Sequence, residues 1–248
     1  MTAPALLAVS HGTASATGAG AVATLVDAVA ARVPDVPVHA GFVDVQQPDV
    51  PTCLAGLREH PAVASTVVVP LLLSAGYHVH VDLREDVDAA VAGGGDVALG
   101  GALGPDDRLV DVLVRRLDEA GLRPDDTVVL AAAGSSDPRA VADCETTAGR
   151  LAARVGRPVT VGYIANATPR VHEVVAAARA ERPGRRVVVA TYLLAPGFFA
   201  DLAARAGGDV TTAPLLVAGA EAPDELVEVV AERYGAVVRA GGAPRPTA

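Results

Sequence analysis

The chain contains no lysine and no tryptophan among its 248 residues, and aromatic residues make up only 3% of it. Without lysine, neither a P-loop lysine nor a lysine Schiff base can form. The scarcity of aromatic residues argues against a surface that stacks nucleic-acid bases. The 20 basic residues are all arginine and are outnumbered by 29 acidic residues, which gives a net charge of −9. This balance disfavours nucleic acid as a partner and favours divalent cations.

The two cysteines, Cys53 and Cys144, lie far apart and form no CxxC pair, so we expect them to be small core residues rather than a disulfide or a thiolate metal site. No apolar run approaches the ~18 residues that a membrane helix needs. The N-terminus "MTAPALLAVSHG" shows neither a basic leader nor a cleavage pattern. We therefore expect a cytoplasmic protein.

Short apolar runs alternate with longer alanine-rich stretches of helical character. Runs without polar alternation are typical of strands covered on both faces, as in a parallel sheet, and the helical stretches supply the crossovers. We predict strands at 5–9, 36–43, 66–72, 97–99, 127–131, 159–164, 186–193 and 210–212, with long helices that include 19–33 and 106–120. The pattern predicts an α/β protein.

The series of elements repeats. "LLAVSHGT" (Leu6–Thr13) resembles "VLAAAGSS" (Val129–Ser136), and "PLLLSAGYH" (Pro70–His78) resembles "TYLLAPGFF" (Thr191–Phe199), at an offset of about 121 residues. Two matches at one spacing indicate two copies of a unit. We therefore predict two similar lobes related by internal duplication, each a four-stranded parallel sheet flanked by helices with flavodoxin-like winding.

The boundary between the copies is expected in "EAGLRPDD", 119–126, where Gly121 ends a helix and Pro124 follows. This predicts an N-terminal lobe at 1–122 and a C-terminal, degenerate lobe at 123–240. The composition of the remainder, 241–248, is typical of a flexible tail.

Two histidines of the first copy are replaced in the second. His11 is matched by Ala133 and His78 by Phe199. With strand order 2-1-3-4, the first and third strands are neighbours, and ligands bind outside their carboxyl ends. His11 follows the first strand and His78 the third, while Asp44 follows the second. We therefore expect these side chains to share one crevice in the N-terminal lobe.

The segment "GYHVHVD", Gly76–Asp82, admits two conformations. In a helix, His78 and Asp82 lie on one face, and Asp82 can fix the tautomer of His78 from behind. In an extended chain, His78 and His80 share a face instead. We favour the helix, with His80 as an accessory ligand. Two imidazoles and a carboxylate suit a borderline metal, and imidazole accepts protons near neutral pH.

The other three histidines are expected to have no functional role: His39 lies in a predicted strand, His60 at a helix end and His172 early in a helix.

The loop "HGTASATGAG" that opens the first helix supplies Gly12 for backbone freedom and Thr13, Ser15 and Thr17 as possible helix caps or hydroxyl donors. It either binds an anion, such as a substrate carboxylate, or is an ordinary polar turn.

These residues resemble a known family. "LLAVSHGT" (Leu6–Thr13), "FVDVQQPDVP" (Phe42–Pro51) and "VVVPLLLSAGYHVHVD" (Val67–Asp82) are similar to signature segments of the CbiX/SirB sirohydrochlorin chelatases, class II tetrapyrrole chelatases. "YLLAPGFFADLA" (Tyr192–Ala203) resembles the C-terminal half of the two-lobed members. The motifs cover much of the first half in the family's order.

The resemblance implies insertion of a divalent metal, Fe²⁺ for sirohaem or Co²⁺ for cobalamin, into sirohydrochlorin in the cleft between the lobes. His11 and His78 would be catalytic and, with Asp44 and His80, would bind the metal, with Asp82 behind them. The tetrapyrrole and a divalent metal (Fe²⁺, Co²⁺ or Ni²⁺) would be the substrates, and no organic cofactor is implied. The protein would be a monomer or homodimer without nucleic-acid or membrane partners.

Substrate contacts are expected from Ser10, Gly12, Thr13, Gly76, Tyr77 and Arg84. The chain departs from the family at Ala14, where an arginine is common, and at Asp44, where glutamate is common. Arg58 and Arg139 are further candidates for binding the substrate's carboxylates.

Two other functions fit some of these residues. A phosphatase of the phosphohistidine type places an arginine before the His-Gly pair, but this chain has Ser10 there. A non-enzymatic metal carrier would use the same histidines, yet it has no evident use for a second lobe that encloses a macrocycle.

Overall fold

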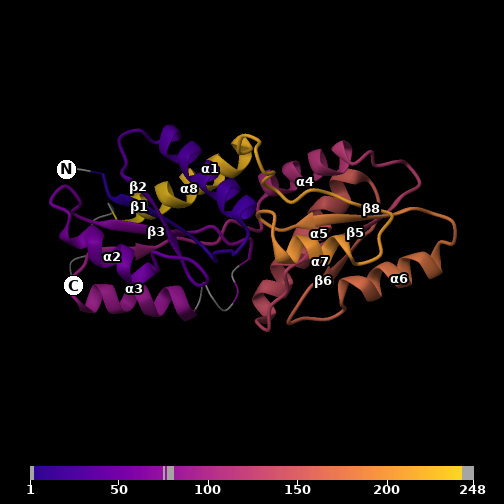
Figure 1. Ribbon diagram of the computed structural model, residues 1–248, viewed down its shortest axis with the longest axis horizontal. Coiled ribbons are helices and arrows are strands. Elements are labelled where there is room, and N and C mark those ends of the chain that lie inside the picture. Colours follow the sequence, from indigo (N-terminus) through magenta and orange to yellow (C-terminus); the bar gives the residue numbers. More distant parts are fainter. Residues whose placement is uncertain (1–2, 75, 77–80, 242–248) are drawn as a thin grey trace.

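The computed structural model describes residues 3–74, 76 and 81–241. Strands and helices alternate along the chain (Figure 1). The first half contains β1 (Ala5–Ser10), α1 (Ala16–Arg32), β2 (Val38–Phe42), α2 (Val50–Glu59), β3 (Thr66–Pro70), α3 (Leu83–Ala92), β4 (Val97–Leu99) and α4 (Asp107–Glu119). The second half contains β5 (Thr127–Ala132), α5 (Pro138–Val155), β6 (Val159–Tyr163), α6 (Val171–Glu181), β7 (Val187–Tyr192), α7 (Phe198–Ala204), β8 (Val210–Thr211) and α8 (Asp224–Gly241).

The strands form two four-stranded parallel sheets of identical winding. The order is β2-β1-β3-β4 in the first sheet and β6-β5-β7-β8 in the second. In the first sheet, Leu6 of β1 pairs with Val38 on one side and with Val67 on the other. The central strands β1 and β3 are buried along their whole length, as their unbroken apolar sequences predict. Both the two-lobed α/β fold and the assumed strand order are confirmed.

The last helix of each half packs on the sheet of the other half. Helix α4 contacts α5 and β7 of the second sheet, and α8 returns to contact α1 and β3 of the first (Figure 1). Helices α4 and α8 also contact each other. The domain boundary expected near residue 122 separates the two sequence repeats and stays a prediction. It does not separate the packed units, because α4 and α8 each cover the sheet of the other repeat. Gly241 ends α8, and the rest of the expected tail lies outside the described residues.

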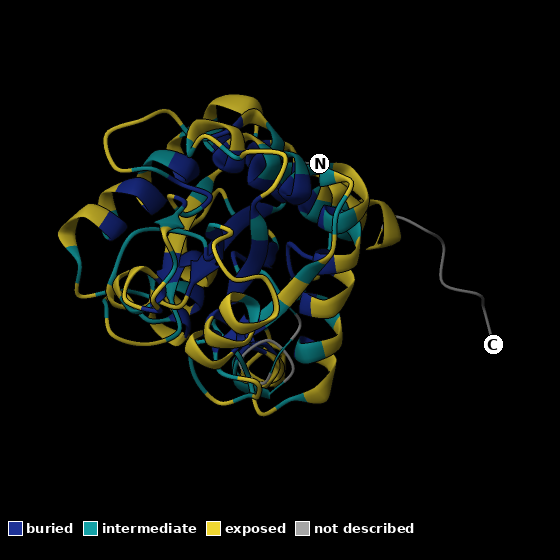
Figure 2. Cartoon of the chain, turned by 90° about the vertical axis from the view of Figure 1, so that its right-hand side faces the viewer, coloured by how far each residue is buried: buried dark blue, intermediate teal, exposed yellow. Residues whose placement is uncertain are grey.

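One hydrophobic core joins the two lobes. It includes Leu6 and Leu25 of the first lobe, Leu130 of the second, and the buried faces of the two exchanged helices, among them Leu113 and Val229. Smaller clusters lie under α2 and α3 on the first sheet and under α6 and α7 on the second. Figure 2 shows the buried strands inside and the exposed helix faces around them. In the part of the chain that the structure describes, no helix is both long and apolar enough to span a bilayer.

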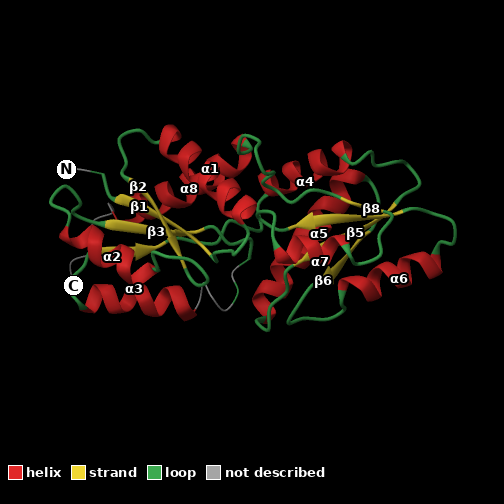
Figure 3. Cartoon of the chain, in the orientation of Figure 1, coloured by secondary structure: helices red, strands yellow, loops and turns green. Residues whose placement is uncertain are grey.

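The carboxyl ends of both sheets lie toward the middle of the molecule (Figure 3). In doubly wound folds the ligand site lies beyond these ends, because the loops there carry side chains that the sheet holds in place. The two lobes therefore bring their loop-bearing edges to a common region.

Candidate active site

The loop that follows β1 carries the first predicted residue, His11. Ser10 is buried at the end of the strand, and His11 directly after it is exposed. Two bonds from the loop after β2 hold this turn, since the amide of Val43 donates to Ser10 O at 2.9 Å and that of Asp44 to His11 O at 3.1 Å. The neighbouring strand thus fixes the backbone of His11.

Gly12 allows the loops after β1 and β2 to approach closely. Its φ of +91° is a conformation that other residues rarely adopt, and a Cβ atom there would lie 2.2 Å from the carbonyl oxygen of Asp44. The amide of the next residue, Thr13, donates to Gln46 Oε1 at 2.8 Å. The expected role of Gly12 in backbone freedom is therefore confirmed.

Asp44 lies beside His11, as its place after β2 predicted. Its side-chain Oδ1 accepts the amide of Val45 at 2.7 Å, and its carbonyl oxygen accepts the amide of Gln46 at 2.6 Å. Val45 has a φ of 63°, which is unusual for a β-branched residue, and it is 57% exposed. Such strain concentrates at functional sites.

The second repeat builds the same loops without the chemical groups. Gly134 has a φ of +89°, and a Cβ atom there would lie 1.9 Å from Ala165 O. The amide of Ala165 donates to Ala133 O at 2.9 Å, as that of Asp44 does to His11 O, and Asn166 matches Val45 with a φ of 52°. The backbone is retained while alanine replaces both His11 and Asp44. The imidazole and carboxylate groups are thus present in the first repeat and absent from the matching positions of the second.

Two loop contacts join the lobes beside His11. A Cβ atom at Gly18, in the first turn of α1, would lie 2.2 Å from Pro196 O, and one at Gly197 would lie 3.2 Å from Thr13 Oγ1. The loop after β7 of the second lobe therefore touches the loop after β1 of the first. Ser15 begins α1 as the predicted cap, accepting the amide of Gly18 at 3.3 Å.

A second pair of loops meets in the same way. A Cβ atom at Gly76, after β3, would lie 3.2 Å from Ser135 Oγ and 3.2 Å from Ala140 Cβ, both beyond the end of β5. Gly76 follows β3 and contacts the loop after β5, whereas Gly197 follows β7 and contacts the loop after β1. Since β1 pairs with β3, and β5 with β7, these two contacts are equivalent in the repeat. The carboxyl ends of the two central strand pairs therefore face each other.

The predicted residues Tyr77, His78 and His80 lie outside the described residues. The helix expected over this segment therefore stays a prediction. Beyond them, residues 81–82 are helical and lead into α3. Asp82 is half-buried there, and Arg84 is exposed in the first turn of the helix. Among the described residues, no group of three or more histidine, cysteine or acidic side chains could hold a metal ion. The backbones of two members of the predicted metal set, His11 and Asp44, are joined by a hydrogen bond.

The two further arginine candidates lie at opposite ends of the sheets. Arg139, in the first turn of α5, is exposed beside Ala140, which approaches Gly76, and it pairs with both carboxylate oxygens of Asp137 at 3.1 and 2.8 Å. Arg58 instead donates to Gly93 O at 3.0 Å, before the start of β4. Arg58 is thus remote from the carboxyl ends, whereas Arg139 lies beside the loop contact.

The other three histidines lie in a strand, at a helix end and in a helix, and not in the loop after β1. His39 is exposed as the second residue of the edge strand β2, His60 follows the last residue of α2, and His172 is exposed in the first turn of α6. Cys144 is buried and Cys53 half-buried, and neither forms a disulfide.

Several residues at the lobe contact were not predicted from the sequence. Gln46, Ser135, Pro196 and Gly197 supply the contacts that hold the loops in place. The repeat offered a signal for the last two, because they match Ala75 and Gly76 of the first copy. It did not indicate that they would touch the loop after β1.

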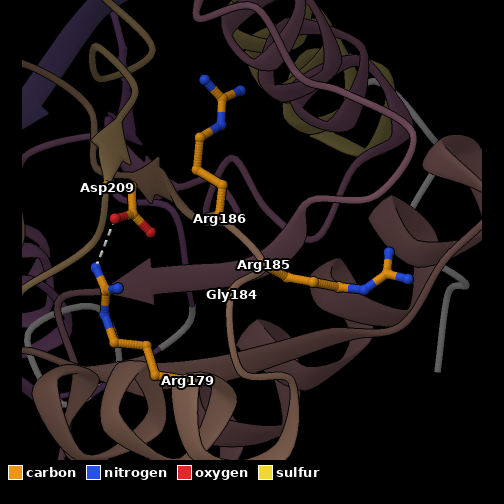
Figure 4. A pocket seen from close by; sticks show the side chains of 5 residues that line it. All are labelled: Arg179, Gly184, Arg185, Arg186 and Asp209. Carbon is orange, nitrogen blue, oxygen red and sulfur yellow. Dashed lines mark ion pairs between the residues drawn. The ribbon is translucent and has the colours of Figure 1, made fainter.

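A separate hollow of about 320 Å³ is lined by Arg179, Gly184, Arg185, Arg186 and Asp209. Figure 4 shows Arg179 paired with Asp209, while Arg185 and Arg186 point elsewhere. Their partners are Asp125 and Asp126, which precede β5. Each arginine thus forms an ion pair with a different aspartate near the amino end of a strand. The three guanidinium groups do not point toward one common binding position.

Two duplicated parallel sheets that face each other through their carboxyl ends, with a histidine loop in one copy only, define a chelatase-like α/β protein. The CbiX family model matches residues 5–120 and 127–203, which includes most of both repeats. The chain belongs to the CbiX family.

Curated relatives and solved structures agree with this assignment. The chain is 29% identical over 199 residues to the sirohydrochlorin ferrochelatase of Priestia megaterium, covering 78% of this chain and 74% of that protein. It is 27% identical over 124 residues to the sirohydrochlorin cobaltochelatase of Methanosarcina acetivorans, covering 46% of this chain and 95% of that protein. The fold is that of SirB from Bacillus subtilis with Fe³⁺, with a TM-score of 0.78, 22% identity, and coverage of 97% and 96% of the two chains.

Proposed function

We propose that this protein inserts a divalent metal ion, Fe²⁺ or Co²⁺, into sirohydrochlorin between its two lobes. The family assignment supports this, as do the names of a ferrochelatase and a cobaltochelatase among its relatives. The observation that carries the proposal is the arrangement of the loop after β1, which presents His11 beside Asp44 at the edge where the second lobe approaches.

The reaction sets two physical requirements. Two pyrrole N–H protons must leave as the metal enters, and the metal must be held while its water ligands are removed. A neutral imidazole meets both, because its free nitrogen can bind a borderline metal or accept a proton. We assign these roles to His11 and His78, with Asp44 and His80 as additional metal ligands and Asp82 as the group that orients His78.

The carboxylate groups of the substrate need positive partners in a protein of net charge −9. Arg84 and Arg139 are exposed in the first turns of α3 and α5, which follow the two loops that meet at Gly76. Ser10, Gly12, Thr13 and Tyr77 are assigned to the same substrate-binding region. Holding the macrocycle from two sides supplies the orientation that metal insertion requires.

The test is anaerobic incubation of the purified protein with sirohydrochlorin and Fe²⁺, Co²⁺ or Ni²⁺, followed by absorbance spectroscopy. We expect the spectrum of the metal complex to appear faster than in protein-free controls. A non-enzymatic carrier would bind the metal without accelerating this change, and that outcome would refute the proposal.

A further inference from the structure

Two of the three phenylalanines in the chain lie on the surface, next to each other. Phe198 is 68% exposed and Phe199 is 38% exposed, and their ring centroids are 6.1 Å apart. Exposed apolar area of this size is unfavourable in water unless something covers it. The pair forms the start of α7 and is not needed to fill either core.

The pair lies beside the loop of His11. Gly197 immediately precedes Phe198, and a Cβ atom at Gly197 would lie 3.2 Å from Thr13 Oγ1 and 3.8 Å from Ser15 Cβ. Exposed Val45 borders the same loop, because its neighbour Asp44 donates to His11 O. Among the described residues, the exposed large hydrophobic side chains are these three and Val91, which is near the end of α3. Three of the four thus lie on or next to the loops that border His11.

The repeat gives the pair a further meaning. Phe199 occupies the place in the second copy that His78 occupies in the first, about 121 residues earlier. Duplication therefore left a histidine at this position in one copy and an apolar ring in the other. A flat conjugated ligand whose charges lie on its rim matches such a site, since its face is apolar while the rim can reach arginines.

We propose that Phe198 and Phe199, with Val45, form the apolar surface against which the face of the tetrapyrrole packs. This inference rests on the proposed function. The phenylalanines bind and position the ring, while the handling of the metal and the protons is assigned to the histidines. They are positioning and substrate-binding residues, and they take no part in proton transfer.

The test compares Phe198→Ala, Phe199→Ala and the double variant with Val91→Ala, a matched exposed apolar control. We expect the KM for sirohydrochlorin to rise about tenfold in the double variant while kcat changes little, because the lost contact acts on ring binding. Titration of metal-free sirohydrochlorin, followed by its fluorescence, should show the same weakening. Co²⁺ binding measured by calorimetry should be unchanged, and Phe199→Tyr should restore most of the ring affinity.

Each other result has a distinct meaning. If wild-type protein inserts metal but the double variant has unchanged KM and ring affinity, the surface has been assigned wrongly while the proposed function stands. If the alanine variants convert a dimer into a monomer in analytical ultracentrifugation, the pair covers a second copy of the chain and the inference is overturned. If wild-type protein neither binds sirohydrochlorin nor inserts metal, the proposed function itself fails.

Discussion

Arg116 and Arg233 make the same pair of hydrogen bonds in the two halves of the molecule. Each is the tenth residue of its helix, α4 or α8. Arg116 donates to Pro214 O at 3.1 Å and Leu215 O at 2.9 Å, and Arg233 donates to Ala102 O at 2.9 Å and Leu103 O at 2.9 Å. Each guanidinium thus fastens an exchanged helix to the chain that leaves the sheet it covers.

We expect Arg116→Ala to lower the free energy of unfolding by about 3 kcal/mol, because it leaves two carbonyl groups without their charged donor. Arg116 is only 7% exposed, so water cannot easily replace it. Urea unfolding checks this, with Arg150→Ala as control. The exposed ion pair of Arg150 with Asp107 should contribute less than ~1 kcal/mol. A loss no larger in Arg116→Ala than in the control would contradict the role of the buried arginine.

Comparing Gly12→Ala with Gly134→Ala distinguishes an effect on stability from an effect on metal insertion. Both residues have positive φ, and in both a Cβ atom would overlap a carbonyl oxygen of the next loop. We expect both substitutions to destabilise the fold by a similar amount, about 2 kcal/mol or more. Only Gly12→Ala should also reduce metal insertion in the protein that remains folded, because it displaces His11 and Asp44. Equal activity of the two variants per folded molecule would argue against a special role of the first loop.

The charge of Asp106 predicts a pH dependence of stability. Hydrogen bonds from the Arg108 side chain, assisted by its amide and by Arg233, lower the pKa of Asp106 to about 2 from the ordinary value of 3.8, although partial burial opposes them. Because the pKa is depressed in the folded state, the stabilisation is complete above about pH 4 and is lost as the pH falls toward 2.

Asp106→Asn can still cap α4 but carries no charge. Its deficit in unfolding free energy should therefore be largest near pH 6 and small near pH 2. Asp107→Asn, at an exposed site, is the matched control. A deficit in Asp106→Asn that does not depend on pH would show that the charge contributes nothing.

The cysteines should differ in reactivity. Burial, together with nearby Asp143 and Glu145, raises the pKa of the Cys144 thiol to about 12. Burial and Asp49 also raise the pKa of Cys53, which is only half-buried. Since the thiolate is the reactive form, a thiol reagent at pH 8 should label Cys53 slowly and Cys144 only after unfolding. Rapid labelling of Cys144 in the native protein would contradict its placement in the core.

Much of this architecture could be predicted from the sequence. Unbroken apolar strands such as Val67–Val69 and the repeated turn around Gly12 and Gly134 indicate two parallel sheets and the ends at which ligands bind. The exchange of α4 and α8 could not be predicted, because an amphipathic helix shows which face is buried but not which sheet it covers. The approach of Gly197 to Thr13 was also hidden, since contacts between distant loops leave no periodic signal.

The central claim is that the first repeat alone carries the chemistry through His11. The most direct measurement is the anaerobic rate of Co²⁺ insertion into sirohydrochlorin by His11→Ala and by His172→Ala, with each variant shown to be folded by circular dichroism. We predict that His11→Ala falls by about a hundredfold or to the spontaneous background, while His172→Ala keeps the wild-type rate. Equal rates in both variants would contradict the account.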